Sequence, residues 1–204
     1  MTSLKLKEFL KRNEHLTFPK GIPGKSPSAA FDAGSSQRRP QVRNHLHPFV
    51  LAAPELYHSR HLTAEVTCSD ARVDPRDYFG LKFGEALVIR NAGGRAVDAF
   101  RSLEVMGSIA PIGLIVVVHH TDCGGMFTTE EEIRSKLSDR APAHAASIKD
   151  KWFGTFRDVG VDESVRQDVE EIRRWSFLPA ETQVVGYALD IETGVMREVA
   201  SENP

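Results

Sequence analysis

Residues Glu65–Arg72 read Glu-Val-Thr-Cys-Ser-Asp-Ala-Arg, a short β-prone run that breaks into a turn. The run ends in a thiol at Cys68, and a carboxylate at Asp70 and a guanidinium at Arg72 follow on alternate residues. Such groups are poor packing material at the end of a strand, because charged side chains are almost never buried without a partner. This stretch therefore predicts a strand with a functional site at its carboxyl end.

A second stretch, Ile115–Gly125, repeats the arrangement, because its apolar run passes into His-His-Thr-Asp-Cys-Gly-Gly. Two residues separate His120 from Cys123, so both side chains can reach one ion from a single tight turn, and the glycines permit that turn. Zinc prefers thiolate sulfur and imidazole nitrogen in a tetrahedral arrangement. We therefore predict that Cys68, His120 and Cys123 bind one Zn²⁺ per chain.

The cysteine count leaves two alternatives to a metal site. The chain has 2 cysteines, and both fall in these two stretches. A disulfide is not expected in a reducing cytosol, and a chain of this size does not need one. Two unrelated buried thiols are the other alternative, since cysteine often serves as a small core residue. Random burial would not place each cysteine at a strand end beside histidine, aspartate and glycine, so metal binding is favoured.

Length and charge limit the class of protein. A chain of 204 residues and 22.6 kDa fits one globular domain with an ample core. The net charge of -2 gives no electrostatic reason to expect nucleic acid or an acidic membrane as a partner. No apolar run approaches the roughly 20 residues that cross a bilayer, and the amino terminus lacks the apolar segment of a secretory signal. We expect a cytoplasmic protein without nucleic-acid or membrane partners.

Around the two stretches, strand and helix patterns alternate along the chain. Apolar runs predict strands at residues 62–68, 86–90, 114–119 and 183–190, with a hairpin partner at 195–199. Helical spacing predicts helices at residues 3–16, 97–108 and 161–175, and a short helix at 74–78. Runs that are apolar throughout suit parallel strands covered on both faces. The prediction is an α/β fold, with a mainly parallel sheet flanked by helices, an antiparallel edge strand and an N-terminal helical arm.

The segment between residues 128 and 159 is less regular. Thr128 and Thr129 predict a capped helix start, and the run Glu130–Glu132 that follows is interpreted as a solvated first turn. After residue 141 the pattern is ambiguous. Trp152, Phe153 and Phe156 are interpreted there as packing groups.

Asp70 decides what the predicted metal site can do. Three protein ligands leave a fourth position for water, which is typical of a catalytic zinc rather than a structural one. Asp70 is close enough either to hydrogen-bond that water or to become the fourth ligand itself. Arg72 can hold Asp70 through a charge-assisted fork, which would orient the carboxylate as an acceptor. The alternative is an Asp-Arg pair that only ties down the turn.

The combination Cys68-x-Asp70-x-Arg72 with His120-x-x-Cys123-Gly124 resembles the β-class carbonic anhydrases. The run Arg90–Gly94, Arg-Asn-Ala-Gly-Gly, resembles the glycine-containing loop that lines the cleft in that family. The resemblance covers roughly residues 66–199. It implies a β-carbonic-anhydrase-like catalytic domain over residues 61–204, preceded by an N-terminal helix and extended arm over residues 1–60.

The resemblance also implies roles for individual residues. Cys68, His120 and Cys123 would be the zinc ligands, Asp70 and Arg72 the catalytic dyad, and Gly93 and Gly94 substrate-binding residues. Asp70 would be paired with Arg72 in an open, active state, and would be the fourth zinc ligand only in a closed state.

The implied reaction is the reversible hydration of carbon dioxide to bicarbonate and a proton, by attack of zinc-bound hydroxide. The implied assembly is an obligate homodimer or a dimer of dimers. A carbonyl sulfide or carbon disulfide hydrolase on the same scaffold is the nearest alternative. A non-catalytic zinc protein and a redox protein that uses the two cysteines are more distant ones.

His119 is next to the predicted ligand His120, so a role as a proton shuttle is a hypothesis to consider. Adjacent residues of a strand face opposite sides of the sheet, however. We therefore expect His119 to be a packed or hydrogen-bonded histidine.

Overall fold

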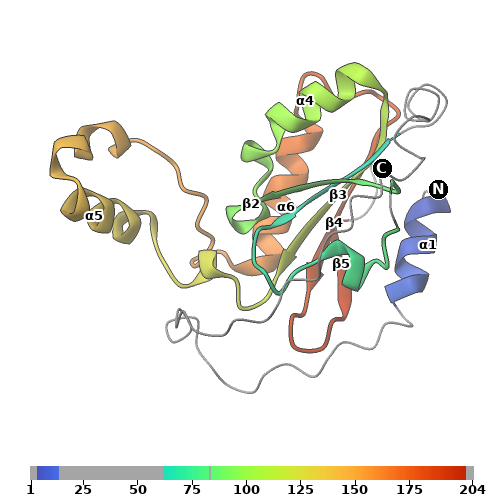
Figure 1. The fold of residues 1–204 in the computed structure, drawn as a ribbon, viewed down its shortest axis with the longest axis horizontal. Helices are drawn as coiled ribbons and strands as arrows, with labels where there is room; N and C mark the ends of the chain where they lie inside the picture. The colour runs from blue at the N-terminus through green and yellow to red at the C-terminus, as the bar shows by residue number, and fades with distance from the viewer. Residues whose placement is uncertain (1–3, 14–61, 83, 201–204) are drawn as a thin grey trace, which may run out of the picture.

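The structure, a computed structural model, describes residues 4–13, 62–82 and 84–200 (Figure 1). The predicted extended arm lies outside these residues. Within the described residues, five strands form one sheet in the order β2-β1-β3-β4-β5. They are β1 (Leu62–Cys68), β2 (Leu87–Asn91), β3 (Ile112–His120), β4 (Gln183–Leu189) and β5 (Met196–Ala200). The first four are parallel and β5 pairs antiparallel with β4, which confirms the predicted fold class.

Among the described residues, one helix precedes β1 and the other helices lie in the connections between strands. They are α1 (Leu4–Asn13), α3 (Pro75–Tyr78), α4 (Phe100–Ile109), α5 (Glu130–Arg140) and α6 (Gly160–Arg173). The helix expected over residues 97–108 is divided, because a 3₁₀ turn at Ala96–Asp98 precedes α4. Further 3₁₀ turns cover Ala92–Gly94, Gly124–Met126 and Pro142–Ile148. Within the described part of the chain, no helix combines the length and the apolar character needed to cross a bilayer.

Both faces of the sheet are buried, which explains why β3 is apolar throughout. Ile115 and Val117 pack in the core that includes residues of α4 and α6. Leu114, Val116 and Val118 point to the opposite face and share a core with α1. Figure 1 shows α4 and α6 on one side of the sheet and α1 on the other. Alternate side chains of one strand therefore serve two cores.

The short amino-terminal helix is held by tertiary contacts, as isolated helices of this length are marginal in water. Leu6 and Phe9 of α1 are buried against the sheet. Arg12 Nη1 donates to Glu85 Oε2 at 2.7 Å and to the carbonyl of Gly80 at 3.0 Å. These contacts dock α1 onto the segment that leads into β2.

The predicted capped start of α5 is confirmed, but two details near this helix differ from the sequence interpretation. Thr129 and Glu132 form the reciprocal capping box of α5. Glu130 is not simply solvated, because its carboxylate accepts hydrogen bonds from the backbone N–H groups of Phe153 and Thr155. Trp152 is 47% exposed and is not a core residue, whereas Phe156 is fully buried as expected.

A carboxyl group is buried inside β1. Glu65 accepts a hydrogen bond from the hydroxyl of Tyr78, which also lies 3.2 Å from the hydroxyl oxygen of Thr67. Thr67 in turn donates to the carbonyl of Val118 in β3 at 3.1 Å. Burial raises the pKa of Glu65 to about 8, although the hydrogen bond from Tyr78 opposes the shift. Near neutral pH this side chain is therefore largely protonated.

Replacing Glu65 with glutamine should remove a pH-dependent loss of stability. Because the pKa is higher in the folded chain, the stability linked to the bound proton is full below about pH 4 and is lost as pH rises through 8. Glu65→Gln keeps an acceptor for Tyr78 and cannot ionise. We expect urea unfolding to show the variant gaining about 2 kcal/mol relative to the parent between pH 6 and pH 9.

The hydroxyl of buried Tyr187 contacts the exposed carboxylate of Glu198, and this contact offers a control, Glu198→Gln, in which burial of the carboxyl is absent. A difference between Glu65→Gln and the parent that does not change with pH would contradict the assignment.

Candidate metal centre

The pairing of β1 with β3 brings two predicted ligands to one edge of the sheet. Cys68 is the last residue of β1 and His120 is the last residue of β3. The two strands are parallel neighbours, with Thr67 opposite Val118, so their carboxyl ends coincide. Cys123 follows in the turn after β3. The carboxyl edge of an open parallel sheet is where ligands commonly bind.

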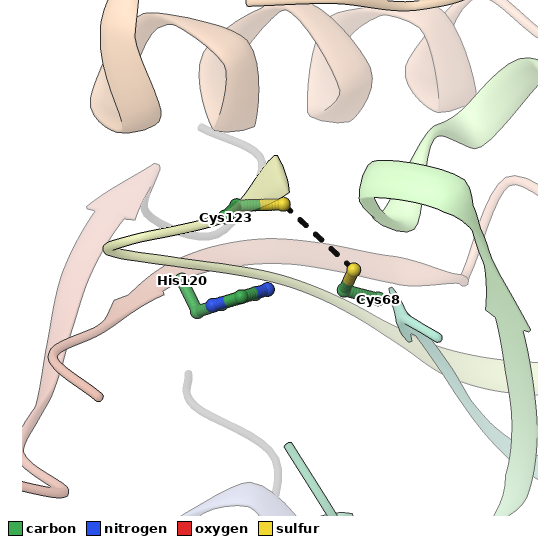
Figure 2. Close-up of side chains that lie close together, drawn as sticks. All are labelled: Cys68, His120 and Cys123. Atoms are coloured by element: carbon green, nitrogen blue, oxygen red, sulfur yellow. Dashed lines mark hydrogen bonds between the residues drawn. The ribbon is translucent and has the colours of Figure 1, made fainter. Parts of the chain in front are cut away.

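The three predicted ligands converge. The sulfur atoms of Cys68 and Cys123 lie 3.8 Å apart, and one ligand atom from each of the three residues falls within 4.8 Å of the others. Figure 2 shows the two cysteine side chains and the imidazole of His120 gathered at this edge. All three side chains are buried. The convergence predicted from the sequence is confirmed.

The imidazole of His120 is oriented as a metal ligand. Its Nδ1 lies 2.8 Å from the carbonyl oxygen of Thr121, which can only accept, so Nδ1 is the donor nitrogen of the ring. In the neutral ring the lone pair then lies on Nε2, which is buried without a hydrogen-bond partner among the described residues. A bare imidazole nitrogen beside two sulfurs is the donor set that Zn²⁺ prefers.

The two thiols share charge unequally. The hydrogen bond with Cys123, with a smaller contribution from His120, lowers the pKa of Cys68 to about 4. The pKa of Cys123 is raised, because it is hydrogen-bonded to Cys68 and a second thiolate would lie beside the first. The pair therefore holds one negative charge readily and resists a second. A divalent cation is the partner that would stabilise both thiolates together.

Asp70 and Arg72 form the expected fork. Arg72 donates from Nε to Asp70 Oδ1 at 3.0 Å and from Nη2 to Oδ2 at 2.7 Å, and its backbone N–H also reaches Oδ1. These hydrogen bonds hold the pKa of Asp70 below its usual value. The carboxylate is thus an ionised acceptor, paired with Arg72, next to Cys68. Arg90 stiffens this turn by donating to the carbonyls of Cys68, Asp70 and Val73.

The glycine loop after β2 touches the ligand-bearing strand. Asn91 pairs with Cys68 in the parallel register, and both Gly93 and Gly94 are buried. A Cβ on Gly94 would lie 3.0 Å from the carbonyl carbon of Thr67 and 3.1 Å from the nitrogen of Cys68. The loop therefore packs against the strand that carries Cys68, and substrate binding by these glycines stays a prediction.

His119 is packed, as expected, and belongs to a buried network that the sequence reasoning missed. Its Nδ1 lies 2.7 Å from the hydroxyl of Ser164 and its Nε2 lies 3.1 Å from a carboxylate oxygen of Asp168. Asp168 also pairs with Arg95, whose Nη2 donates to Oδ1 at 3.0 Å. The network ties α6 to the sheet beside the metal centre. Neither Arg95 nor Asp168 lies in a motif that signals this contact.

Asp122 was also missed. Arg72 Nη1 donates to its Oδ2 at 2.6 Å, so a second carboxylate joins the fork. The available signal was its position between His120 and Cys123, which places it at the same sheet edge as Asp70.

Together, fold and site define an α/β protein with a buried Cys-His-Cys group that could hold a metal ion and an adjoining carboxylate–guanidinium pair. The sequence model of the carbonic anhydrase family matches residues 63–196. The chain belongs to the β-class carbonic anhydrase family.

Three similar proteins support this assignment. β-carbonic anhydrase 1 of Mycobacterium bovis is 34% identical over 142 residues, which cover 69% of this chain and 83% of that protein. The structure of a carbonic anhydrase from Glaciozyma antarctica has a TM-score of 0.64 at 32% identity, covering 77% of this chain and 98% of that one. A carbon disulfide hydrolase of Acidianus is 32% identical over 152 residues, which cover 65% of this chain and 74% of that protein.

The close approach of Gly94 to β1 can be tested against a matched glycine. Gly84 also has positive φ, but a Cβ there would meet no atom within 4 Å among the described residues. Both Gly→Ala changes should cost about 1 kcal/mol for the left-handed backbone. Gly94→Ala should cost about 1–3 kcal/mol more, because the added methyl overpacks Thr67 and Cys68.

Urea unfolding and zinc content measure the two effects. We expect Gly94→Ala alone to lower zinc content, since Cys68 must shift. Equal losses of stability in the two variants would contradict a packing role for Gly94.

Proposed function

We propose that this chain is a zinc enzyme that catalyses the reversible hydration of carbon dioxide to bicarbonate and a proton. The observation that carries the proposal is the fork between Asp70 and Arg72 beside three converging ligands. A purely structural zinc site would have a fourth sulfur or nitrogen ligand. Among the described residues, no further cysteine or histidine joins this group. The reaction named for the Mycobacterium and Glaciozyma relatives agrees with the proposal.

The side chains would divide the work between holding the ion and handling a proton. Cys68, His120 and Cys123 would hold Zn²⁺, which supplies the Lewis acidity that makes water a nucleophile near neutral pH. Asp70, kept ionised by Arg72, would accept a hydrogen bond from a water in the site and would so orient its lone pair toward the carbon of the substrate.

The open arrangement, with Asp70 on Arg72, is proposed as the active state. Rotation of Asp70 onto the ion would fill the fourth position and stop the reaction. Gly93 and Gly94, packed against the ligand strand, are proposed to line the substrate cleft.

We also propose that the chain assembles as a homodimer or a dimer of dimers. In the described sheet, β2 is an edge strand, and Val88 on it is 42% exposed. Val105 and Ile109 of α4 are exposed as well, at 47% and 55%. A groove lined by residues of β2 and α4 includes Val88 and Val105. Exposed apolar side chains beside an open strand edge are suited to pairing with a second copy.

Hydrolysis of carbon disulfide or carbonyl sulfide is the second candidate function, because the Acidianus relative carries the name carbon disulfide hydrolase. Stopped-flow measurement of carbon dioxide hydration, set beside hydrogen sulfide release from each sulfur compound, separates the candidates. We expect carbon dioxide to give the highest kcat/KM. A higher value for either sulfur compound would reverse the assignment of substrate.

A neighbouring Asp-x-Arg pair provides a control for the role of Asp70. Asp74 and Arg76 make the same contacts, with the backbone N–H of Arg76 donating to Asp74 Oδ1 at 2.9 Å, but Asp74 caps α3 instead of joining the ligand cluster. We expect Asp70→Asn to lower kcat/KM for hydration about a hundredfold, with zinc retained, and Asp74→Asn to leave kcat/KM near that of the parent.

Metal analysis completes the test. If Asp70→Asn keeps full activity, Asp70 only ties down the turn. If it loses zinc, Asp70 serves the ligand set rather than the reaction.

A further inference from the structure

Asp122 has an unusual backbone and an unusual partner. It lies in the turn between His120 and Cys123, with φ of 54°, and it is the one non-glycine residue with positive φ in the described part of the chain. Side chains other than glycine, asparagine and aspartate rarely adopt this conformation. Such strained residues persist where surrounding contacts fix them, and they cluster at functional sites.

A single guanidinium fixes Asp122. Arg72 donates from Nη1 to Asp122 Oδ2 at 2.6 Å and from Nη2 to the backbone carbonyl of Asp122 at 2.9 Å. Among the described residues, Arg72 is the one hydrogen-bond donor to the Asp122 carboxylate. The other edge of the same guanidinium, Nε with Nη2, is committed to Asp70. Arg72 therefore bridges the turn that follows Cys68 at the end of β1 and the turn that joins His120 to Cys123 after β3.

The bridge matters because Arg72 is poorly restrained without it. Its side chain is 45% exposed, so its pair with Asp70 alone would be screened by water and would compete with many other rotamers. Two further acceptors on Asp122 select one rotamer and present the Nε edge to Asp70. The planar fork of arginine allows both carboxylates to be engaged at once.

We propose that Asp122 is a positioning residue that holds Arg72 in place, so that Asp70 stays on the guanidinium and the fourth position on the ion stays open. The inference rests on the proposed roles of Asp70 and Arg72. Without the Asp122 carboxylate, Arg72 loses its Nη1 partner and keeps only the backbone carbonyl of residue 122 beside Asp70, so it leaves Asp70 more often and Asp70 is free to turn toward the ion. Asp122 acts only through Arg72 and needs no contact with the substrate.

Two substitutions test the bridge without disturbing the turn, because glycine and asparagine both tolerate positive φ. Asp122→Gly removes the carboxylate, whereas Asp122→Asn retains an oxygen that can accept from Nη1. Asp162→Asn is the matched control, since Asp162 also pairs with an arginine, Arg197, at 2.6 Å on the surface but lies outside the metal centre.

The probe is thiocyanate, titrated into the full chain loaded with Co²⁺ in place of Zn²⁺ and followed by visible absorption. An anion of this kind reports whether the fourth position is open. We expect Asp122→Gly to weaken thiocyanate binding at least about fivefold, and to lower kcat/KM of the zinc form about tenfold, because the clamp on Asp70 is lost. Asp122→Asn should recover most of both losses, and Asp162→Asn should match the parent.

The direction in which thiocyanate affinity changes in Asp122→Gly distinguishes loss of Arg72 positioning from a simple loss of negative charge. Removal of a negative charge near the ion would by itself tighten the binding of an anion. Thiocyanate binding that is unchanged or tighter in Asp122→Gly would therefore overturn the inference, as would loss of metal from this variant or a failure of Asp122→Asn to recover. If the parent binds thiocyanate but does not hydrate carbon dioxide, the proposed reaction fails, while the thiocyanate shift still decides the role of Asp122.

Discussion

The site depends on the parallel pairing of β1 with β3. The two strands are neighbours, and their carboxyl ends lie at the same edge of the sheet, which brings Cys68 close to His120. The strands are far apart in the sequence, since Thr67 of β1 and its partner Val118 of β3 are 51 residues apart. The pairing is fixed by burial, since a shift of one residue would turn every apolar side chain of β3 to the wrong core. The energy that holds the strands together thus also sets the distance between the ligands.

Polar and close backbone contacts at this edge hold the candidate ligands in position. Arg72 closes the gap between the two ligand turns, and the backbone of Gly94 lies directly against Cys68. Behind them, the buried contacts of His119 with Ser164 and Asp168 join α6 to the end of β3. Preorganised groups of this kind are what a catalytic centre requires, because donors and acceptors that are already in place need no rearrangement during the reaction.

Much of this arrangement was predictable from the sequence because it follows from local rules. Apolar runs located the strands, Thr129 marked a helix start, and the spacing from Cys68 to Arg72 indicated the fork. Because parallel strands end at the same edge of a sheet, Cys68 and His120 were predicted to lie close together. These inferences needed only periodicity, capping and ligand chemistry.

The features that were missed depend on contacts between residues far apart in the chain. Arg95 meets Asp168 across 73 residues, and no motif marks either partner. Asp122 was overlooked because its role depends on the rotamer of Arg72, which the sequence does not encode locally. Glu130 was taken for a solvated acid because its partners, the N–H groups of Phe153 and Thr155, lie more than 20 residues further on. Glu65 is polar within an apolar strand, and only the fold shows that Tyr78 is its partner.

X-ray absorption at the zinc edge of the purified protein, combined with metal analysis, tests the central claim most directly. We expect about one zinc per chain, bound by two sulfur atoms at about 2.3 Å and at least one imidazole nitrogen at about 2.0 Å. Protein that contains no zinc when purified, or zinc with fewer than two sulfur ligands, would contradict it.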